Sequence, residues 1–289
     1  MSISSKWHTL TAAVRGMAGI TQQLQQVHAS LDHLTRASGT LFLQRISQQL
    51  PPGHLAHHGY SVYAQTDEDG IIAEILRRIG PGNLHFVEVG VGDGLQCNTT
   101  HLLQQGWRGT WVEGDPDAGR RIQEIFQHPI RSGRLKLQTE YATQENISQL
   151  LPSAIPDLLS IDIDGNDYWI WQALPDTARM VVIEYNAGLG PEIDWVMPYD
   201  PASRWDGTRY HGASLRALHR LGQSKGYRLV GCNLTGVNAF FVREDCGGTA
   251  FPPAADPRVH YLPPLYDSKP HPAGRLSGHE VSPREILPD

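Results

Sequence analysis

A fifteen-residue stretch, from Phe86 to Thr100, constrains the fold of this chain more than any other part of the sequence. It reads FVEVGVGDGLQCNTT, so a short run of β-forming residues is followed at once by three alternate glycines. The apolar run predicts a buried strand, and the glycines predict a tight turn that opens a helix near Cys97. We therefore expect an α/β protein with a ligand site at this turn.

The spacing of the three glycines indicates the kind of ligand. A dinucleotide fingerprint has its third glycine three residues after the second, where this chain has Leu95. Glu88 stands two residues before the first glycine, so we expect a carboxylate at the end of the strand, beside a backbone that a ligand can approach closely. A carboxylate at that position favours a cationic ligand over a diphosphate.

The pattern E-x-G-x-G-x-G at residues 88–94 resembles motif I of the class I methyltransferases that depend on S-adenosylmethionine (SAM). Glu113 ends the next predicted strand, where an acid would accept hydrogen bonds from the two ribose hydroxyls. The resemblance implies a SAM site made by Gln65, Glu88, Gly90, Gly92, Gly94, Asn98, Glu113 and Asp162. The alternative is a turn in which the glycines serve packing and the acids are merely solvated.

Length and charge limit the classes of protein to consider. The 289 residues suffice for one large α/β domain with extensions. Thirty acidic and 24 basic residues give a net charge of −6, which argues against a nucleic-acid partner. Three irregularly spaced cysteines favour a reducing compartment over a zinc site. Without a long apolar run or a signal peptide pattern, the sequence predicts a cytoplasmic protein with no membrane partner.

Composition divides the chain into three predicted parts. Residues 1–52 have apolar side chains at roughly helical spacing and are expected to form a helical extension. Its apolar stripe would pack on the main domain or on a second subunit of a homo-oligomer. The predicted SAM-dependent methyltransferase domain covers 53–246, after a break at Pro51 and Pro52. Residues 247–289 are rich in proline and predict an irregular tail.

A helix is predicted just before the glycine-rich stretch. Apolar residues recur at helical spacing from Ile71 to Ile79, and acids precede them in the first turn. Helix capping alone would explain these acids. Together with Gln65 they also resemble the opening of FkbM-type methyltransferases, which implies that Gln65, Glu68 and Asp69 line the pocket.

Strands and helices alternate along the rest of the predicted domain. Further strands are expected at 134–138, 157–164 and 180–186, and helices at 117–126, 146–151, 168–174 and 213–225. This alternation predicts a Rossmann-like, doubly wound α/β sheet. The segments YRLVGCN and AFFVRED predict a C-terminal antiparallel hairpin around Asn233 to Asn238, a feature of the class I methyltransferase fold.

Acidic residues crowd the ends of the fourth and fifth predicted strands. Asp162 and Asp164 follow one strand, and Glu184 ends the next. Their burial is costly unless a cation compensates them, and oxygen ligands suit Mg²⁺ or Ca²⁺ better than zinc. Resemblance to sugar and macrolide O-methyltransferases implies that these three acids hold Mg²⁺ or Mn²⁺. Capping of the following helix without a metal is the alternative.

The reaction implied is a displacement at the SAM methyl carbon by a deprotonated acceptor. A metal can lower the pKa of a bound hydroxyl, and His211, after the long loop that follows the fifth strand, is the candidate general base, with Asp162 as the second catalytic residue. The aromatic residues of that loop suit a small, polar, ring-shaped acceptor. We therefore expect a biosynthetic enzyme that methylates a hydroxyl of a saccharide or natural product.

Two other functions remain open. A nucleotide-binding oxidoreductase would use the same fold, although Leu95 and Glu88 argue against it. A non-catalytic scaffold that binds SAM would retain every motif described above.

Overall fold

The computed structural model describes residues 45–80, 82–175, 178–251 and 256–265, together with Gln23 and Val27. The chain divides into two compact units, and the described part of the larger unit runs from Gln49 to Leu265. The predicted N-terminal helices and the end of the predicted tail lie largely outside the described residues. None of the described helices is long and apolar enough to cross a membrane.

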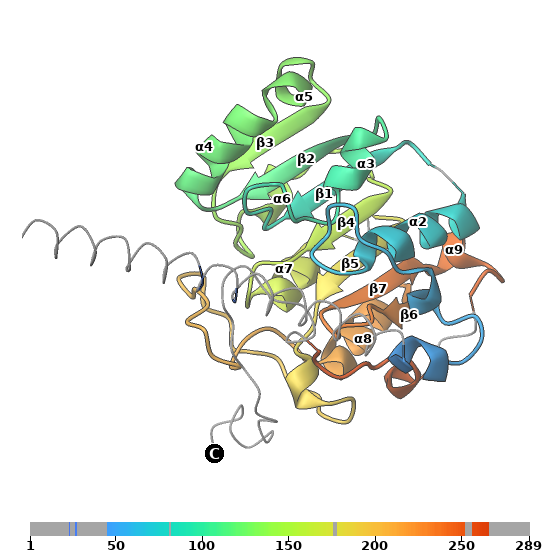
Figure 1. The fold of residues 1–289 in the computed structure, drawn as a ribbon. Coiled ribbons are helices and arrows are strands. Elements are labelled where there is room, and N and C mark those ends of the chain that lie inside the picture. Colours follow the sequence, from blue (N-terminus) through green and yellow to red (C-terminus); the bar gives the residue numbers. More distant parts are fainter. Residues whose placement is uncertain are drawn as a thin grey trace, which may run out of the picture. The chain divides into compact units, whose positions relative to one another are not determined.

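A seven-stranded sheet lies at the centre of the larger unit (Figure 1). Its strands are β1 (His85–Val89), β2 (Arg108–Glu113), β3 (Leu135–Thr139), β4 (Leu158–Ile161), β5 (Met180–Glu184), β6 (Tyr227–Cys232) and β7 (Asn238–Arg243). They are arranged in the order β3-β2-β1-β4-β5-β7-β6, in which β1 to β5 are parallel and β7 is antiparallel to both of its neighbours. The predicted doubly wound sheet with a C-terminal antiparallel hairpin is confirmed.

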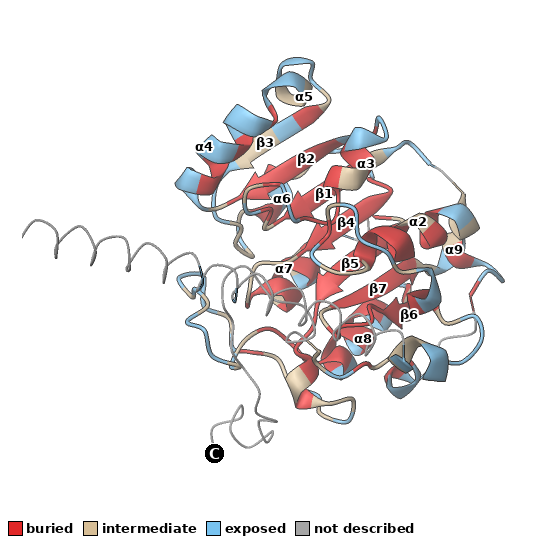
Figure 2. Ribbon diagram, in the orientation of Figure 1, coloured by how far each residue is buried: buried red, intermediate tan, exposed pale blue. Residues whose placement is uncertain are grey.

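Helices pack against both faces of this sheet. They are α2 (Glu68–Ile79), α3 (Thr100–Gln104), α4 (Pro116–Ile125), α5 (Gln127–Arg131), α6 (Ile147–Leu150), α7 (Asp167–Ala173), α8 (Leu215–Ser224) and α9 (Glu244–Gly247), with short 3₁₀ turns η1 (Leu55–His58), η2 (Ala187–Leu189) and η3 (Pro257–Val259). Except for the edge strand β3, the strands are almost entirely buried between these layers (Figure 2).

Alternate residues of the central strands belong to two separate cores, as the two-residue repeat of a strand requires. Val181 and Ile183 of β5 pack in the core that contains α7 and α8. Met180 and Val182 pack in the core that contains α2. In β1, β2, β4 and β5, odd- and even-numbered residues therefore lie on opposite faces of the sheet.

The structure differs from the sequence prediction at three places. Helix α5 was not predicted; its Pro129 lies in the first turn, where a proline removes no intrahelical hydrogen bond. The last predicted strand ends at Arg243, and α9 follows it. Residues 256–265, in the predicted tail, pack on the domain with His260 and Leu262 buried.

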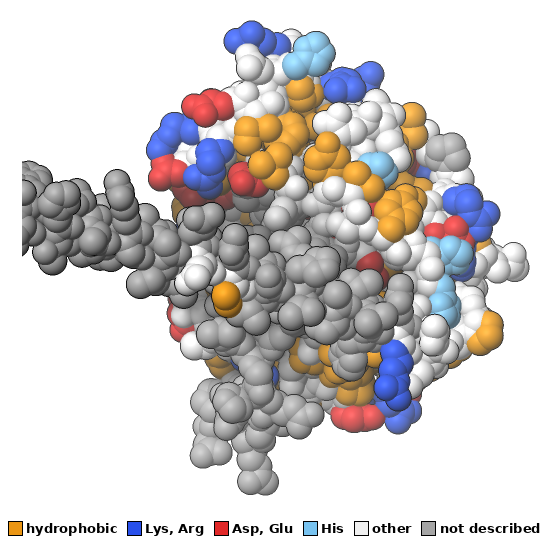
Figure 3. All heavy atoms as spheres, viewed as in Figure 1, with side chains coloured by type: hydrophobic (Ala, Val, Ile, Leu, Met, Phe, Trp, Pro, Cys, Tyr) orange, Lys and Arg blue, Asp and Glu red, His pale blue; other side chains and the backbone are white. Residues whose placement is uncertain are grey.

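Charged groups of both signs lie on the outer surface of α4. Arg120 pairs with Asp117 one turn away on this helix. In Figure 3, basic (blue) and acidic (red) side chains lie next to each other in the region that Figure 1 labels α4. This part of the surface is therefore mixed in charge.

Candidate active site

The register of the sheet places five residues in one row across the carboxyl ends of the parallel strands. Val89 pairs with Val112 on one side and Ile161 on the other, and Ile161 pairs with Ile183. One residue further along, the row reads Glu113, Gly90, Asp162, Glu184 and Asn238. We call these residues the carboxyl row. It crosses the point between β1 and β4 where the strand order reverses, which is where ligands bind in such sheets.

The side chains of the carboxyl row lie on the α2 face of the sheet. Glu184 and Asn238 are two residues from Val182 and Phe240, which both pack in the core that contains α2. Glu68, in the first turn of α2, accepts a hydrogen bond from Asn238 Nδ2 at 3.1 Å. The predicted acids of strand ends and helix start therefore meet at one edge of the sheet.

A side chain is disfavoured at each of the three glycines of the turn, but for different physical reasons. All three have positive φ angles, which side chains disfavour. A Cβ at Gly90 would lie 1.7 Å from the carbonyl oxygen of Asp162, and a Cβ at Gly94 would meet the rings of Trp111 and Phe126. A Cβ at Gly92 would meet nothing within 4 Å. Gly92 is therefore the position where the turn is open to a ligand.

Glu113 lies directly beside this turn. Its Oε2 accepts hydrogen bonds from the backbone amides of Val91 at 3.0 Å and Gly92 at 2.6 Å, and its Oε1 accepts one from Asp115 at 2.7 Å. A carboxylate offers about four acceptor positions, so capacity for a further donor remains. The residue predicted to bind ribose thus also fixes the glycine turn.

Glu88 is buried, with 1% of its surface exposed. It accepts hydrogen bonds from the backbone amides of Asn98 at 2.8 Å and Thr99 at 3.1 Å and from Thr99 Oγ1 at 2.5 Å. Asn98 Nδ2 donates to Ser160 Oγ at 3.0 Å. Burial raises the pKa of Glu88, against the lowering effect of these hydrogen bonds. Glu88 and Asn98 thus hold the residues just before α3 in place. Direct contact of either residue with a ligand stays a prediction.

The acids at the start of α2 hold the loop that precedes it. One oxygen of Asp69 accepts hydrogen bonds from three consecutive backbone amides, at 62–64. Glu68 accepts hydrogen bonds from Thr66 and from Asn233 of the β6–β7 turn. Gln65 lies exposed in this loop. The two acids therefore position the loop, and a ligand contact by Gln65 stays a prediction.

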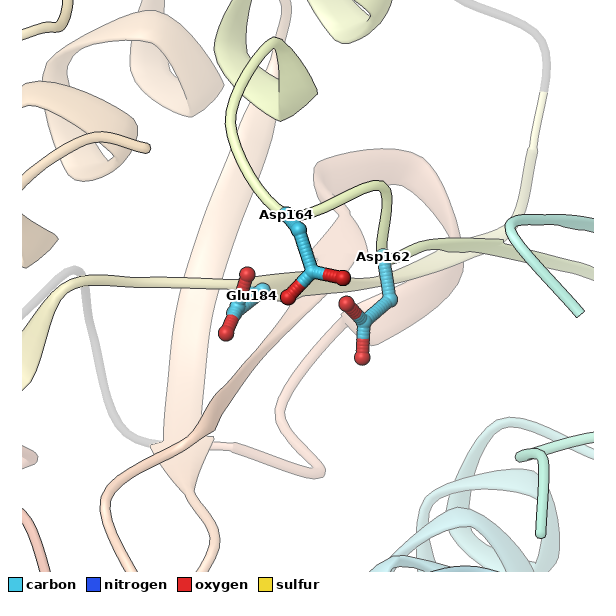
Figure 4. A group of neighbouring side chains, drawn as sticks. All are labelled: Asp162, Asp164 and Glu184. Atoms are coloured by element: carbon cyan, nitrogen blue, oxygen red, sulfur yellow. The ribbon is translucent and has the colours of Figure 1, made fainter. Parts of the chain in front are cut away.

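Asp162, Asp164 and Glu184 come together as the sequence predicts. One carboxylate oxygen from each lies within 4.8 Å of the others, and no further group of this kind occurs among the described residues. Figure 4 shows the carboxylate of Asp164 between those of the other two residues. Oxygen ligands with this charge fit Mg²⁺ or Mn²⁺.

The loop after β4 is held in a specific conformation by Asp167. Its two carboxylate oxygens accept hydrogen bonds from the backbone amides of Ile163 at 2.8 Å and Gly165 at 2.9 Å. Asp164, between them, has a φ of 56°, in the left-handed region. Burial raises the pKa of Asp162 well above its usual range, and the charges of Asp164 and Asp167 raise it further. A bound cation would offset this repulsion.

His211 lies beside Glu184, one of these three acids. Its Nδ1 is 4.0 Å from Oε2 of Glu184. Asn186, just after β5, donates from Nδ2 to the backbone oxygens of Arg209 at 2.8 Å and His211 at 2.9 Å. Its Oδ1 accepts a hydrogen bond from the backbone amide of Gly188 at 3.1 Å. Asn186 thus positions the segment of the candidate base.

The long loop that precedes His211 also reaches the end of the site near Glu113. The guanidinium of Arg204 lies 3.8 Å from the ring centroid of Tyr141. That ring covers Gly114, where an added Cβ would lie 2.2 Å from it. Trp195 packs on Tyr210 of the same loop at 5.3 Å between ring centroids. The loop therefore reaches from Tyr141, beside Gly114, to His211, beside Glu184.

Two residues of this region were not predicted from the sequence. Tyr141 follows β3 without any motif. Asn238 was assigned only to a hairpin turn, although its spacing of two and four residues from Phe240 and Val242 could have indicated the inward face of a strand.

No model of a known protein family matches the sequence, and no curated protein is similar to it. Among solved structures, the chain is similar to a putative caffeoyl-CoA O-methyltransferase from Staphylococcus aureus, with 9% identity, a TM-score of 0.43, and coverage of 71% of this chain and 98% of that one. It is also similar to an O-methyltransferase from Bacillus cereus in complex with SAH, with 14% identity, a TM-score of 0.39, and coverage of 72% and 88%.

A third similar structure is a SAM-dependent methyltransferase from Clostridium acetobutylicum, with 10% identity, a TM-score of 0.39, and coverage of 59% of this chain and 88% of that one. With identities and TM-scores this low, these similarities do not assign a function to the chain. Any functional assignment depends on its own residues.

Proposed function

We propose that the protein is a SAM-dependent methyltransferase that methylates a hydroxyl of a polar acceptor, such as a saccharide or a natural-product scaffold, with the help of Mg²⁺ or Mn²⁺. The carboxyl row is the observation that supports this proposal best. It combines an open glycine turn, the acid Glu113 at the position predicted for ribose, and three neighbouring carboxylates at one edge of the sheet. Its place at the reversal of strand order suits a nucleoside ligand.

In this proposal the glycine turn and Glu113 bind the nucleoside part of SAM. Gly92 allows close approach of the ligand to the backbone, and Glu113 accepts a hydrogen bond from a ribose hydroxyl. When bound, SAM supplies an electrophilic methyl group. The loop of aromatic residues before His211 holds the acceptor over the strand ends and excludes water from it.

Asp162, Asp164 and Glu184 are the residues proposed to hold the divalent ion. A metal at this position would supply Lewis acidity toward an acceptor hydroxyl. His211, next to Glu184, would take the proton of that hydroxyl. The cytoplasmic location and the homo-oligomer through the N-terminal helices stay predictions.

Calorimetric titration with SAM and S-adenosylhomocysteine tests the cofactor. Micromolar binding is expected, and no binding up to millimolar concentrations would refute the proposal. Binding of NADH in its place would favour an oxidoreductase.

Incubation with methyl-labelled SAM and a metabolite extract tests the reaction. Label should appear in a polar product, and EDTA should stop its formation. Turnover that survives EDTA would refute metal assistance. If SAM binds but no extract fraction accepts the label, the protein is better described as a SAM-binding scaffold.

A further inference from the structure

Asn238, the first residue of β7, lies directly opposite Glu184 in the antiparallel β5–β7 pair. Side chains of directly opposite residues lie on the same face of a sheet, with Cβ atoms about 4.5–5.5 Å apart. Asp162 is the neighbour of Glu184 on its other side in the carboxyl row. Asn238 is 4% exposed, so its amide is enclosed at this edge of the sheet.

The orientation of the Asn238 amide follows from its contact with Glu68. Asn238 Nδ2 donates to Glu68 Oε1 at 3.1 Å. An ionised carboxylate only accepts hydrogen bonds, so the amide nitrogen must face Glu68 and the amide oxygen must face away from it. The backbone amide of Asn238, which donates to Asn233 Oδ1 at 2.8 Å, restricts the residue further.

The amide oxygen of Asn238 is buried and has no hydrogen-bond partner among the described residues. A buried acceptor of this kind is unfavourable unless something electron-poor satisfies it. The ionised carboxylate of Glu184 cannot do so, because it is an acceptor too. A cation that contacts both residues would satisfy the amide oxygen and also reduce the repulsion within the acid cluster.

We infer that Asn238 provides a fourth oxygen, its Oδ1, to the divalent-cation site of Asp162, Asp164 and Glu184. This inference rests on the metal site in the proposed function. Side-chain amide oxygens are common ligands of hard cations such as Mg²⁺ and Ca²⁺. A neutral ligand adds coordination without a further negative charge at a site that already has three acids.

Binding of Mn²⁺ to the full chain, followed by the electron paramagnetic resonance signal of free Mn²⁺, tests this role without any need for turnover. Asn238→Ala should weaken Mn²⁺ binding by about tenfold or more, as loss of a group at a metal site typically does. Thr66→Val is the matched control, because Thr66 also donates to Glu68 Oε1 but lies outside the carboxyl row. It should leave Mn²⁺ affinity unchanged.

Asn238→Asp provides a second readout. It keeps an oxygen in place of Oδ1 but replaces the donor to Glu68 with an acid, so the metal-free variant should have a lower Tm than the wild type. Mn²⁺ should raise the Tm of this variant by more than it raises that of the wild type.

Equal Mn²⁺ affinity of the wild type and Asn238→Ala would overturn the role of Asn238 and leave the three-acid site intact. Equal weakening by Asn238→Ala and Thr66→Val would overturn it as well, because Asn238 would then act only through Glu68. If the wild type binds no Mn²⁺, both the metal site and the role of Asn238 are wrong.

Discussion

Glu113 Oε2 accepts a hydrogen bond from the backbone amide of Gly92 at 2.6 Å, so the end of β2 is tied to the glycine turn after β1. This contact gives Glu113 two roles in the proposed function. It fixes the shape of the turn, and it presents an acceptor at the position expected for ribose.

Replacing Glu113 should therefore weaken SAM binding strongly. Glu113→Ala removes a charged acceptor, and hydrogen bonds to charged groups contribute about 1.5–3 kcal/mol, or roughly 10- to 100-fold in Kd. Isothermal titration with SAM measures this effect. Glu124→Ala, an exposed acid on α4, is the control and should bind SAM like the wild type. Unchanged affinity in Glu113→Ala would contradict the ribose assignment.

Substitutions at the glycines should separate ligand contact from backbone strain. Gly92→Ala and Gly53→Ala both place a Cβ in open space at a positive φ, so each should lose about 1–2 kcal/mol of stability. Gly92→Ala alone should also weaken SAM binding. Urea unfolding and calorimetry measure the two effects. If both variants bind SAM equally well, the ligand does not approach the turn at Gly92.

Asp164→Gly should change stability and metal binding in opposite directions. Glycine tolerates the φ of 56° that Asp164 adopts, so the metal-free protein should gain about 1 kcal/mol in its free energy of unfolding. The variant loses one carboxylate of the cluster, so its Mn²⁺ affinity should fall. Unfolding in EDTA and Mn²⁺ titration test these results. Unchanged Mn²⁺ affinity would remove Asp164 from the site.

The buried His260 should make stability depend on pH. Burial, followed by the nearby His54 and His219, lowers the pKa of His260 from 6.5 to about 4. Between these values the unfolded chain binds the proton and the folded chain does not, so stability is fully present above pH 6.5 and falls as the pH drops toward 4. The contribution is about 3 kcal/mol, at 1.36 kcal/mol per pKa unit.

Urea unfolding at pH 7.5 and pH 4.5 measures this dependence. His260→Gln should lose less stability than the wild type between these two pH values. His128→Gln replaces an exposed histidine on α5 and should behave like the wild type. An identical pH dependence in the wild type and His260→Gln would contradict the assignment.

The sequence predicted the fold well because its signals are local. The run before Gly90, the acids at strand ends and the alternation of elements each require only a short window of residues. The role of an acid is harder to predict. That Glu88 and Asp69 line the ligand pocket stays a prediction, and the structure adds that both accept hydrogen bonds from backbone amides of neighbouring loops. A buried loop needs such acceptors as much as a ligand does, and the two uses look alike in sequence.

The position of Asn238 could not be predicted for a different reason. The hairpin of β6 and β7 is a local feature, but the sequence does not determine which of its two strands pairs with β5. In the structure it is β7, the later strand, that lies next to β5. Only this pairing brings Asn238 opposite Glu184.

The insertion of β7 between β5 and β6 also determines when the site can form during folding. β7 is the last strand along the described chain, yet it is an inner strand of the sheet, and its first residue completes the carboxyl row. Contacts between residues far apart in sequence form slowly, because the intervening chain must first be ordered. A chain still emerging from the ribosome can pair β1 with β2, but it cannot assemble this edge of the sheet until nearly the whole domain has been synthesised.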